Sequence, residues 1–271
     1  MLRDRVVTSV VLAAVVVSAL LLLPPAWLVV VLAAMFLVVG GSEGAVLAGL
    51  GPGPARLVWI GGLCAVGALL VWAFHFAAAV PGILAAASAF WAGLAFWIVR
   101  PALGRAGSDR LQPAKLAIVG VILLSAFVAI AWLHVIDPWL VIYLILIIAA
   151  ADIGAYFSGI SVGGPKLAPS ISPGKTWAGA AGGLVAAILV GAVGSRVVPD
   201  VPFGPLVATP AAAVLVAVSV FGDLVFSLMK RHRSLKDTST LLPGHGGLLD
   251  RVDSLAAAAP PFALLVWWMT G

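Results

Sequence analysis

Long apolar stretches alternate with short polar segments along almost the whole chain. Each stretch approaches the roughly 20 residues that a helix needs to cross the hydrocarbon core of a bilayer. Pro24-Pro25 and Pro81-Gly82 separate neighbouring stretches, because proline removes a backbone donor and disfavours helix before it. The pattern predicts nine membrane-spanning helices, at residues 6–23, 26–48, 57–78, 82–99, 116–134, 139–157, 177–194, 206–228 and 255–269.

The positive charges are confined to alternate loops. If the N-terminus lies inside the cell, 14 of the 15 Lys and Arg residues fall in or beside inner segments, and only Arg196 falls outside. Such a bias is typical of cytoplasmic loops and predicts an N-in, C-out topology for one membrane domain over residues 1–271. The inner segments are 1–5, 49–56, 100–115, 158–176 and 229–254.

Composition supports a membrane protein. Charged residues make up 9% of the chain and hydrophobic residues 63%, whereas roughly 25% of a soluble domain is charged. Soluble globular and disordered classes are therefore excluded. The net charge of +5 is explained by the inner loops, so no nucleic-acid partner is expected. The single cysteine, Cys64, excludes a disulfide framework and a thiol metal site.

Two carboxylates follow long apolar runs. Asp152 comes after LVIYLILIIAAA, and Asp223 comes after AAAVLVAVSVFG. A carboxylate at membrane depth is costly and therefore indicates a function. For Asp152 the alternative is an interfacial residue that caps a break before Gly154. Glu43 leaves the same two readings open, because Gly40–Glu43 interrupts the second apolar run.

Nine of the 25 charged residues lie within residues 223–254. If the eighth span continues as a helix, residues four, seven and eight positions after Asp223 share its face; they are Ser227, Lys230 and Arg231. The same spacing rule places Asp250 and Asp253 together. Further polar residues of this stretch are Lys236, Asp237, His245 and Arg251.

These residue types point to phosphate chemistry. Carboxylates without clustered Cys or His favour Mg²⁺ over zinc, and Lys and Arg bind phosphate groups. Gly246-Gly247 before a helix start can bring backbone N–H groups to an anion, and His245 can contact phosphate or donate a proton. This combination of groups predicts a site for phosphoryl or nucleotidyl transfer. A basic loop that only touches anionic lipid is the alternative, but it leaves four Asp residues unexplained.

A second inner segment, 158–177, is rich in Gly and Pro and carries Lys166 and Lys175. Its PGKT string resembles the end of a P-loop, but Pro169 stands where that motif needs glycine. Either a phosphate-contacting loop or a plain turn is expected. Among the histidines, His75 and His134 are expected to be structural and His232 solvated.

The dense stretch resembles the signature of the CDP-diacylglycerol synthase, or phosphatidate cytidylyltransferase, family. The similarity is strong after residue 139 and looser over residues 1–138. The matching residues are Phe221–Leu224, Ser227, Lys230-Arg231, Lys236-Asp237, Pro243–Gly247, Asp250-Arg251 and Asp253, with a second region at Asp152–Tyr156 and Ser172–Trp177.

The resemblance implies an all-α, nine-helix homodimer that makes CDP-diacylglycerol and pyrophosphate from CTP and phosphatidate. It implies a bacterial inner membrane location with the site on the cytoplasmic face, and Mg²⁺ on Asp223 and Asp250, with K⁺ as a further candidate. The expected catalytic residues are Asp223, Lys230, Arg231, Lys236, Asp237, His245, Asp250, Arg251 and Asp253. The expected substrate-binding residues are Asp152, Tyr156, Ser172, Lys175, Thr176, Ser227, Gly246 and Gly247.

The chain departs from the family pattern at charged positions. Ala178 and Phe226 stand where the family usually has Glu, and Ile160 where it has a basic residue; Ser42 and Gly44 replace tryptophans. A second hypothesis is therefore a weakened or inactive member that binds phosphatidate or nucleotide without turnover. A transporter is disfavoured because the polar residues gather at one face and no repeated halves are found. A CTP-dependent lipid kinase is the nearest enzymatic rival.

Overall fold

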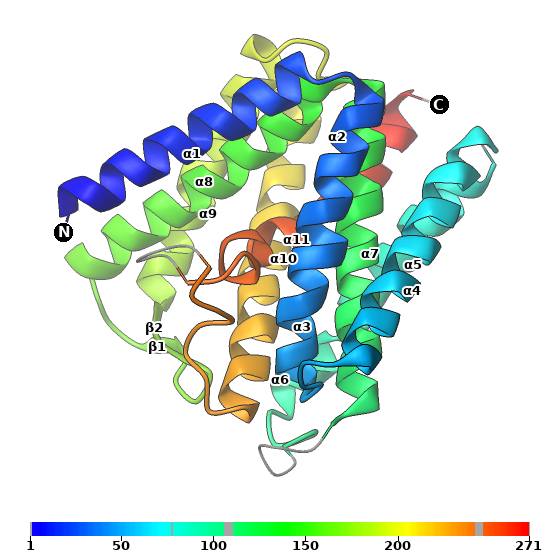
Figure 1. Cartoon of the computed structure of the whole chain (residues 1–271). Helices are drawn as coiled ribbons and strands as arrows, with labels where there is room; N and C mark the ends of the chain where they lie inside the picture. The colour runs from blue at the N-terminus through cyan, green and yellow to red at the C-terminus, as the bar shows by residue number, and fades with distance from the viewer. Residues whose placement is uncertain (1, 77, 106–110, 242–245, 271) are drawn as a thin grey trace.

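The computed structural model describes residues 2–76, 78–105, 111–241 and 246–270, with side chains from Val11 onward, as a bundle of α-helices (Figure 1). The helices are α1 (Leu2–Leu22), α2 (Pro25–Leu32), α3 (Gly40–Ala48), α4 (Pro54–Trp72), α5 (Ala79–Gly93), α6 (Ala95–Val99), α7 (Pro113–Ile136), α8 (Pro138–Ser161), α9 (Trp177–Val197), α10 (Pro205–His232) and α11 (Leu249–Thr270). A π-helical segment, Ala33–Val39, joins α2 to α3, and a 3₁₀ turn, Ala73–His75, follows α4.

Eight of the nine predicted spans are confirmed as helices long and apolar enough to cross a membrane, within the described residues. The predicted first span, 6–23, lies in α1, where Val11–Leu22 forms a shorter apolar helix, so this span stays a prediction. In Figure 1 the β1–β2 hairpin and α6 lie at one end of the bundle and the C-terminus at the other. Which end faces the cytoplasm also stays a prediction.

The expected interruption at Gly40–Glu43 is wrong, because the chain stays helical from Pro25 to Ala48. The glycines instead allow close packing: a Cβ at Gly40 would lie 3.1 Å from the Leu123 side chain, and one at Gly44 would collide with Val119. In membrane helices small residues commonly serve this purpose. As a result α3 packs against α7, and Glu43 is 5% exposed.

Glycines also bring α8 against α9. A Cβ at Gly154 would lie 2.7 Å from the Gly182 carbonyl oxygen, and one at Gly183 would lie 2.7 Å from the carbonyl oxygen of Ala151. The two backbones can therefore approach closely in the region of Asp152. A capping contact sets the start of α9, where the Gly179 N–H donates to the Thr176 hydroxyl over 3.0 Å.

The segment between α8 and α9 is more ordered than its composition suggests. Strands β1 (Lys166–Ala168) and β2 (Ser172–Thr176) form an antiparallel hairpin. At its turn Ile171 is buried against α10, in a small apolar cluster with Leu224 and Leu228. The Ile171 carbonyl also accepts a hydrogen bond from Arg231 Nε at 3.3 Å. The hairpin is thus fixed to the helix that carries Asp223.

Candidate active site

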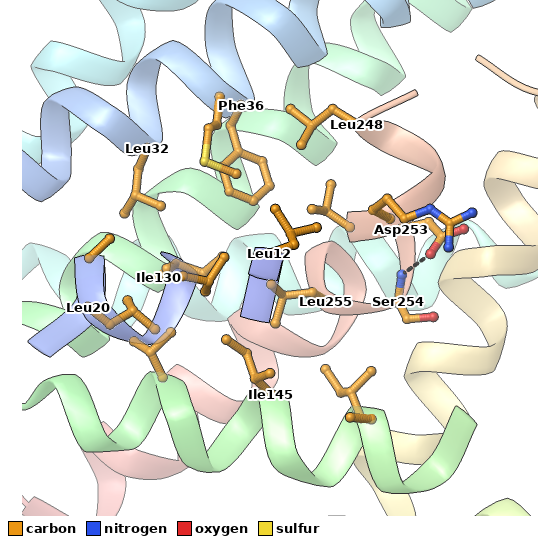
Figure 2. A pocket seen from close by; sticks show the side chains of 18 of the residues that line it. Leu12, Leu20, Leu32, Phe36, Ile130, Ile145, Leu248, Asp253, Ser254 and Leu255 are labelled. Carbon is orange, nitrogen blue, oxygen red and sulfur yellow. Dashed lines mark hydrogen bonds between the residues drawn. The ribbon is translucent and has the colours of Figure 1, made fainter. Parts of the chain in front are cut away.

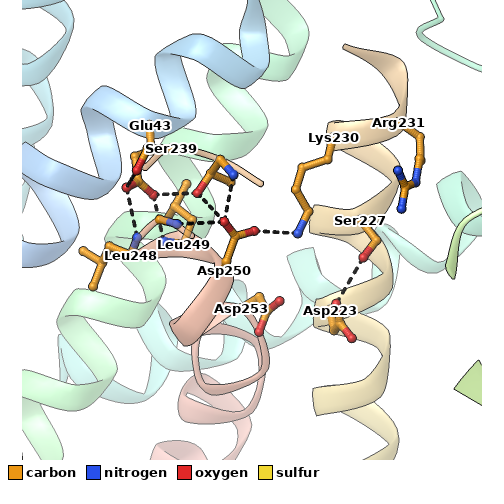
Figure 3. Close-up of polar contacts among 12 residues, drawn as sticks. Glu43, Asp223, Ser227, Lys230, Arg231, Ser239, Leu248, Leu249, Asp250 and Asp253 are labelled. Atoms are coloured by element: carbon orange, nitrogen blue, oxygen red, sulfur yellow. Dashed lines mark hydrogen bonds and ion pairs between the residues drawn. The ribbon is translucent and has the colours of Figure 1, made fainter. Parts of the chain in front are cut away.

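The first ion pair of the site joins the hairpin to α10. Lys175 Nζ on β2 lies 2.6 Å from Asp223 Oδ2, and the Ser227 hydroxyl donates to Asp223 Oδ1 at 3.1 Å. Figure 3 shows Ser227 and Asp223 on one face of α10. The spacing of these two residues in the sequence predicted this shared face.

A second ion pair joins α10 to α11. Lys230 Nζ lies 2.6 Å from Asp250 Oδ1, and both side chains are largely buried (Figure 3). Close packing supports this geometry: a Cβ at Gly222 would lie 2.7 Å from the Asp253 carbonyl oxygen. Removing two charges from water is costly unless further hydrogen bonds satisfy them.

Those further hydrogen bonds come from the loop that precedes α11. Asp250 Oδ2 accepts from the Thr238 N–H at 2.7 Å, from the Thr238 hydroxyl at 2.9 Å and from the Gly247 N–H at 2.9 Å. Asp250 therefore fixes the loop as well as pairing with Lys230.

Glu43 completes this network. Its carboxylate accepts from the Ser239 hydroxyl at 2.6 Å and from the Thr238 hydroxyl at 2.8 Å. The N–H groups of Leu248 and Leu249 each donate to it at 2.9 Å. Two interpretations of Glu43 were left open, an acid in the interior and a residue in a break at the interface. The structure agrees with the first, because Glu43 is buried in a continuous helix. A lone carboxylate in an apolar run was the available signal; its partners could not be found, because they lie 195–206 residues away.

The start of α11 was expected to offer N–H groups to a phosphate. In the structure the chain's own carboxylates take them, Asp250 at Gly247 and Glu43 at Leu248 and Leu249. A Cβ at Gly247 would lie 2.6 Å from either oxygen of Glu43, so glycine permits the close approach of this carboxylate. Gly246 adopts a positive φ of 82°, which glycine tolerates. Substrate contact by these glycines stays a prediction.

Two more carboxylates lie near Asp223. Asp253 on α11 is 9% exposed and lies within hydrogen-bonding reach of it, and the Ser254 N–H donates to Asp253 Oδ1 at 2.7 Å. Asp152 on α8 interacts electrostatically with Lys175, Asp223 and Arg251. Helices α8, α10 and α11 thus each contribute one carboxylate to a cluster next to Lys175.

The remaining predicted residues lie around this network, and two of them, Tyr156 and Thr176, line a cavity beside the hairpin. Arg231, Lys236 and Asp237 are exposed; Tyr156 is also exposed and packs edge-on against Phe157. Ser172 is half-buried in β2 and Thr176 is the cap of α9. His245 lies outside the described residues.

The histidine predictions divide. His134 is structural as expected, because it is buried and its Nε2 lies 2.8 Å from the Leu20 carbonyl oxygen. The expectation for His232 is wrong: it is buried, and its Nε2 lies 2.6 Å from the Pro101 carbonyl oxygen.

The donor chemistry of the cluster fits a hard cation such as Mg²⁺, which proteins often hold by one or two carboxylates plus waters and substrate phosphates. Each oxygen of a carboxylate has about two acceptor sites. Asp250 Oδ2 already accepts two backbone N–H groups and lies 2.9 Å from the Thr238 hydroxyl, so Asp250 could bind a cation only through Oδ1, beside Lys230. Asp223 and Asp253 are the less occupied pair. Across the described ranges no three His, Cys, Asp or Glu side chains form a ready metal group.

Two cavities adjoin the cluster. An apolar cavity of about 430 Å³ lies between α1, α2, α7, α8 and α11; Figure 2 shows Leu20, Phe36 and Ile130 in its wall and Asp253 at its edge. A second cavity of about 560 Å³ lies between α8, the hairpin and α9, lined by Lys166 and Lys175 among others. Asp152 lines both cavities.

The departures from the family pattern have different surroundings. Phe226 is completely buried in the main apolar core. Ile160 is 67% exposed and lines the hairpin cavity. Ala178 is half-buried in the first turn of α9. The charges lost at positions 160 and 178 would therefore lie near the hairpin, whereas the residue changed at position 226 lies in the apolar core.

Comparisons with known proteins agree with the motif. The family model described as "Cytidylyltransferase family" matches residues 3–269. The chain is similar to phosphatidate cytidylyltransferases of Pseudomonas aeruginosa (48% identity, 47% of each chain), Haemophilus influenzae (42%, 49% of each) and Bacillus subtilis (41%, 44% of each). The matched region spans about half the length of these relatives.

Proposed function

The chain belongs to the cytidylyltransferase family, and we propose that it transfers a cytidylyl group from CTP to phosphatidate, giving CDP-diacylglycerol and pyrophosphate. One observation carries this proposal. An apolar cavity and a lysine-lined cavity meet at Asp152, beside the Asp223–Asp253 pair. A reaction between a lipid phosphate and a nucleotide needs these two environments next to each other.

In the proposed reaction, an oxygen of the phosphatidate phosphate bonds to the α-phosphorus of CTP, and the bond from that phosphorus to the pyrophosphate oxygen breaks. The attacking phosphate is already anionic, so the main task is to bring two anions together. Lys175 can do this, because it pairs with Asp223, lines the hairpin cavity and could turn to a phosphate. Lys230 pairs with the buried Asp250 and would hold that carboxylate in place. The proposal gives the leading role to Lys175, one of the expected substrate-binding residues.

The cavities suggest where each substrate binds. The acyl chains suit the apolar cavity, whose wall includes Leu20, Phe36 and Ile130. The nucleotide phosphates suit the hairpin cavity, which presents Lys166 and Lys175. The two reacting groups would then meet near Asp152.

The carboxylates would hold the metal. Mg²⁺, with K⁺ as a further candidate, would screen the charge of the triphosphate when bound. Asp223 would hold it together with Asp253 or with Oδ1 of Asp250. We further propose a homodimer in a bacterial inner membrane with the site on the cytoplasmic face. The bacterial relatives and the basic inner loops support the location.

The non-catalytic alternative is less well supported. The residues that a binding-only member could lose, Asp223, Lys230 and Asp250, are present and engaged in the network described above. The replaced positions at 160, 178 and 226 lie beside this network or in the core.

The test is synthesis of CDP-diacylglycerol by the purified chain in lipid vesicles with phosphatidate, labelled CTP and Mg²⁺. We expect product from the wild type and a loss of about 100-fold or more with Asp223→Asn, comparable to removing one transition-state donor. Asp200→Asn, at the opposite end of the bundle, is the matched control and should leave activity unchanged. Wild-type protein that binds CTP but forms no product would overturn the proposal in favour of the non-catalytic alternative.

A further inference from the structure

Glu43 lies in the N-terminal half of the chain, yet the four hydrogen-bond donors that the described residues offer it are Thr238, Ser239, Leu248 and Leu249. It holds both ends of the segment 238–249, with Thr238 and Ser239 at the beginning and Leu248 and Leu249 at the end. The side chain is 5% exposed. A buried carboxylate is tolerated only when it is well satisfied. Here the Ser239 hydroxyl and the N–H groups of Leu248 and Leu249 donate to it within 2.6–2.9 Å, and the Thr238 hydroxyl at 2.8 Å is a further donor.

The segment that Glu43 holds also carries the donors that orient Asp250. Thr238 is common to both carboxylates: its hydroxyl lies 2.8 Å from Glu43 Oε2 and 2.9 Å from Asp250 Oδ2. A hydroxyl has one hydrogen and can donate to one of them at a time. The state of one carboxylate therefore affects the hydrogen bond available to the other.

The α11 terminus provides a second route between the two acids. Glu43 accepts from the N–H of Leu249, the residue next to Asp250, and so fixes the first turn of the helix from which Asp250 projects. Asp250 in turn pairs with Lys230 at 2.6 Å. A displacement of this turn would change the distance between Asp250 and α10.

We infer that Glu43 is a positioning residue for the transfer reaction, acting on Asp250 through Thr238 and through the first turn of α11. The inference rests on the proposed function for its catalytic consequence. Glu43 itself is buried and is not among the residues that line either cavity. The inference goes beyond the charged motif, because Glu43 lies outside residues 223–254.

The test compares Glu43→Gln with Thr238→Val and the conservative Thr238→Ser. Glutamine has nearly the same shape but offers an amide N–H₂ where backbone donors approach, so it cannot accept from both Leu248 and Leu249. We expect kcat to fall about 10- to 100-fold, as for other residues that orient a catalytic ligand, with KM for CTP within about threefold because only the positioned step is lost. Thr238→Ser should stay near wild type.

The double variant Glu43→Gln/Thr238→Val shows whether the two residues act through the same contact. We expect it to lose less activity than the product of the two single losses, because one interaction cannot be removed twice. Folded Glu43→Gln protein with activity within about twofold of wild type overturns the inference. If Glu43→Gln does not fold, Thr238→Val decides, since it keeps the backbone contacts of Glu43; wild-type kcat there also overturns the inference.

Amide hydrogen exchange provides a readout independent of activity. In Glu43→Gln we expect faster exchange at Thr238 and Gly247, whose N–H groups bond to Asp250, with no change in α7 and α8. Uniformly faster exchange would indicate general destabilisation and contradict a positioning role. If the wild type makes no product, the proposed function fails, while local exchange still shows whether Glu43 orients Asp250.

Discussion

Asp250 and Asp253 lie three residues apart on α11, but their surroundings differ. Asp250 is held by Lys230, Thr238 and Gly247, so it is part of the scaffold of the loop. Asp253 lies instead beside Asp223 and at the edge of the apolar cavity. Neighbouring acids of one motif thus have distinct surroundings: Asp250 organises the chain, and Asp253 keeps a carboxyl group with few hydrogen-bond partners beside Asp223. The predictions below test this division.

The largest effect is expected from breaking the scaffold pair. Lys230→Met leaves Asp250 buried without its cation, which typically costs about 3–5 kcal/mol. Thermal unfolding in detergent should show a strong loss of stability together with loss of activity. Lys236→Met, an exposed lysine of the same motif, is the control and should unfold like the wild type. Equal stability of the two variants would contradict a scaffold role for Asp250.

A smaller effect is expected from filling the space beside Glu43. Gly247→Ala places a methyl group 2.6 Å from the carboxylate oxygens, and overpacking of this kind costs about 1–3 kcal/mol. Gly174→Ala is the control, because its Cβ would meet nothing within 4 Å. The midpoint of thermal unfolding should fall for the first variant only. An unchanged midpoint in Gly247→Ala would show that the loop can relax around it.

At Asp253 stability and activity should change in opposite directions. Asp253→Asn removes an acid whose burial and closeness to Asp223 both disfavour its charged form, so the free energy of unfolding should rise by about 1 kcal/mol. Transfer activity should fall, because a carboxylate next to the reacting groups is lost. Asp200→Asn, at an exposed acid between α9 and α10, should change neither. A less stable Asp253→Asn protein would assign Asp253 to the scaffold.

The smallest effect concerns the cavity beside the hairpin. Ile160→Lys restores a positive charge at an exposed position of that cavity. Solvent-exposed charges contribute about 0.2–1 kcal/mol, so KM for CTP should fall about twofold, and less at high salt. Ile160→Gln adds polarity without charge and should leave KM unchanged. A lower KM for phosphatidate alone would place the lipid headgroup there instead.

Much of the fold follows from the hydrophobic pattern, since eight predicted spans coincide with helices. The motif also placed Asp223 and Ser227 on one face of α10. Glycine was harder to interpret: at Gly40 and Gly44 it permits packing against α7 and does not break the helix.

The features that could not be predicted from the sequence depend on tertiary contacts. The link from Glu43 to Thr238 spans 195 residues, and no local pattern encodes it. His232 was expected in solvent because it lies in a basic run. Instead the segment after α6 packs over it, and its Nε2 lies within hydrogen-bonding distance of the Pro101 carbonyl oxygen. Both features depend on where distant loops pack, which the order of residues alone does not reveal.

The position of Asp152 between the two cavities has a consequence for how substrates enter and products leave. Under the proposed function, the lipid product can return to the bilayer through the apolar cavity, while pyrophosphate leaves through the lysine-lined one. The lipid and the nucleotide would then each enter and leave by a route of their own, and the two routes would meet at Asp152. At the meeting point of the routes, turnover would require Lys175 to exchange Asp223 for a phosphate and then to return to it.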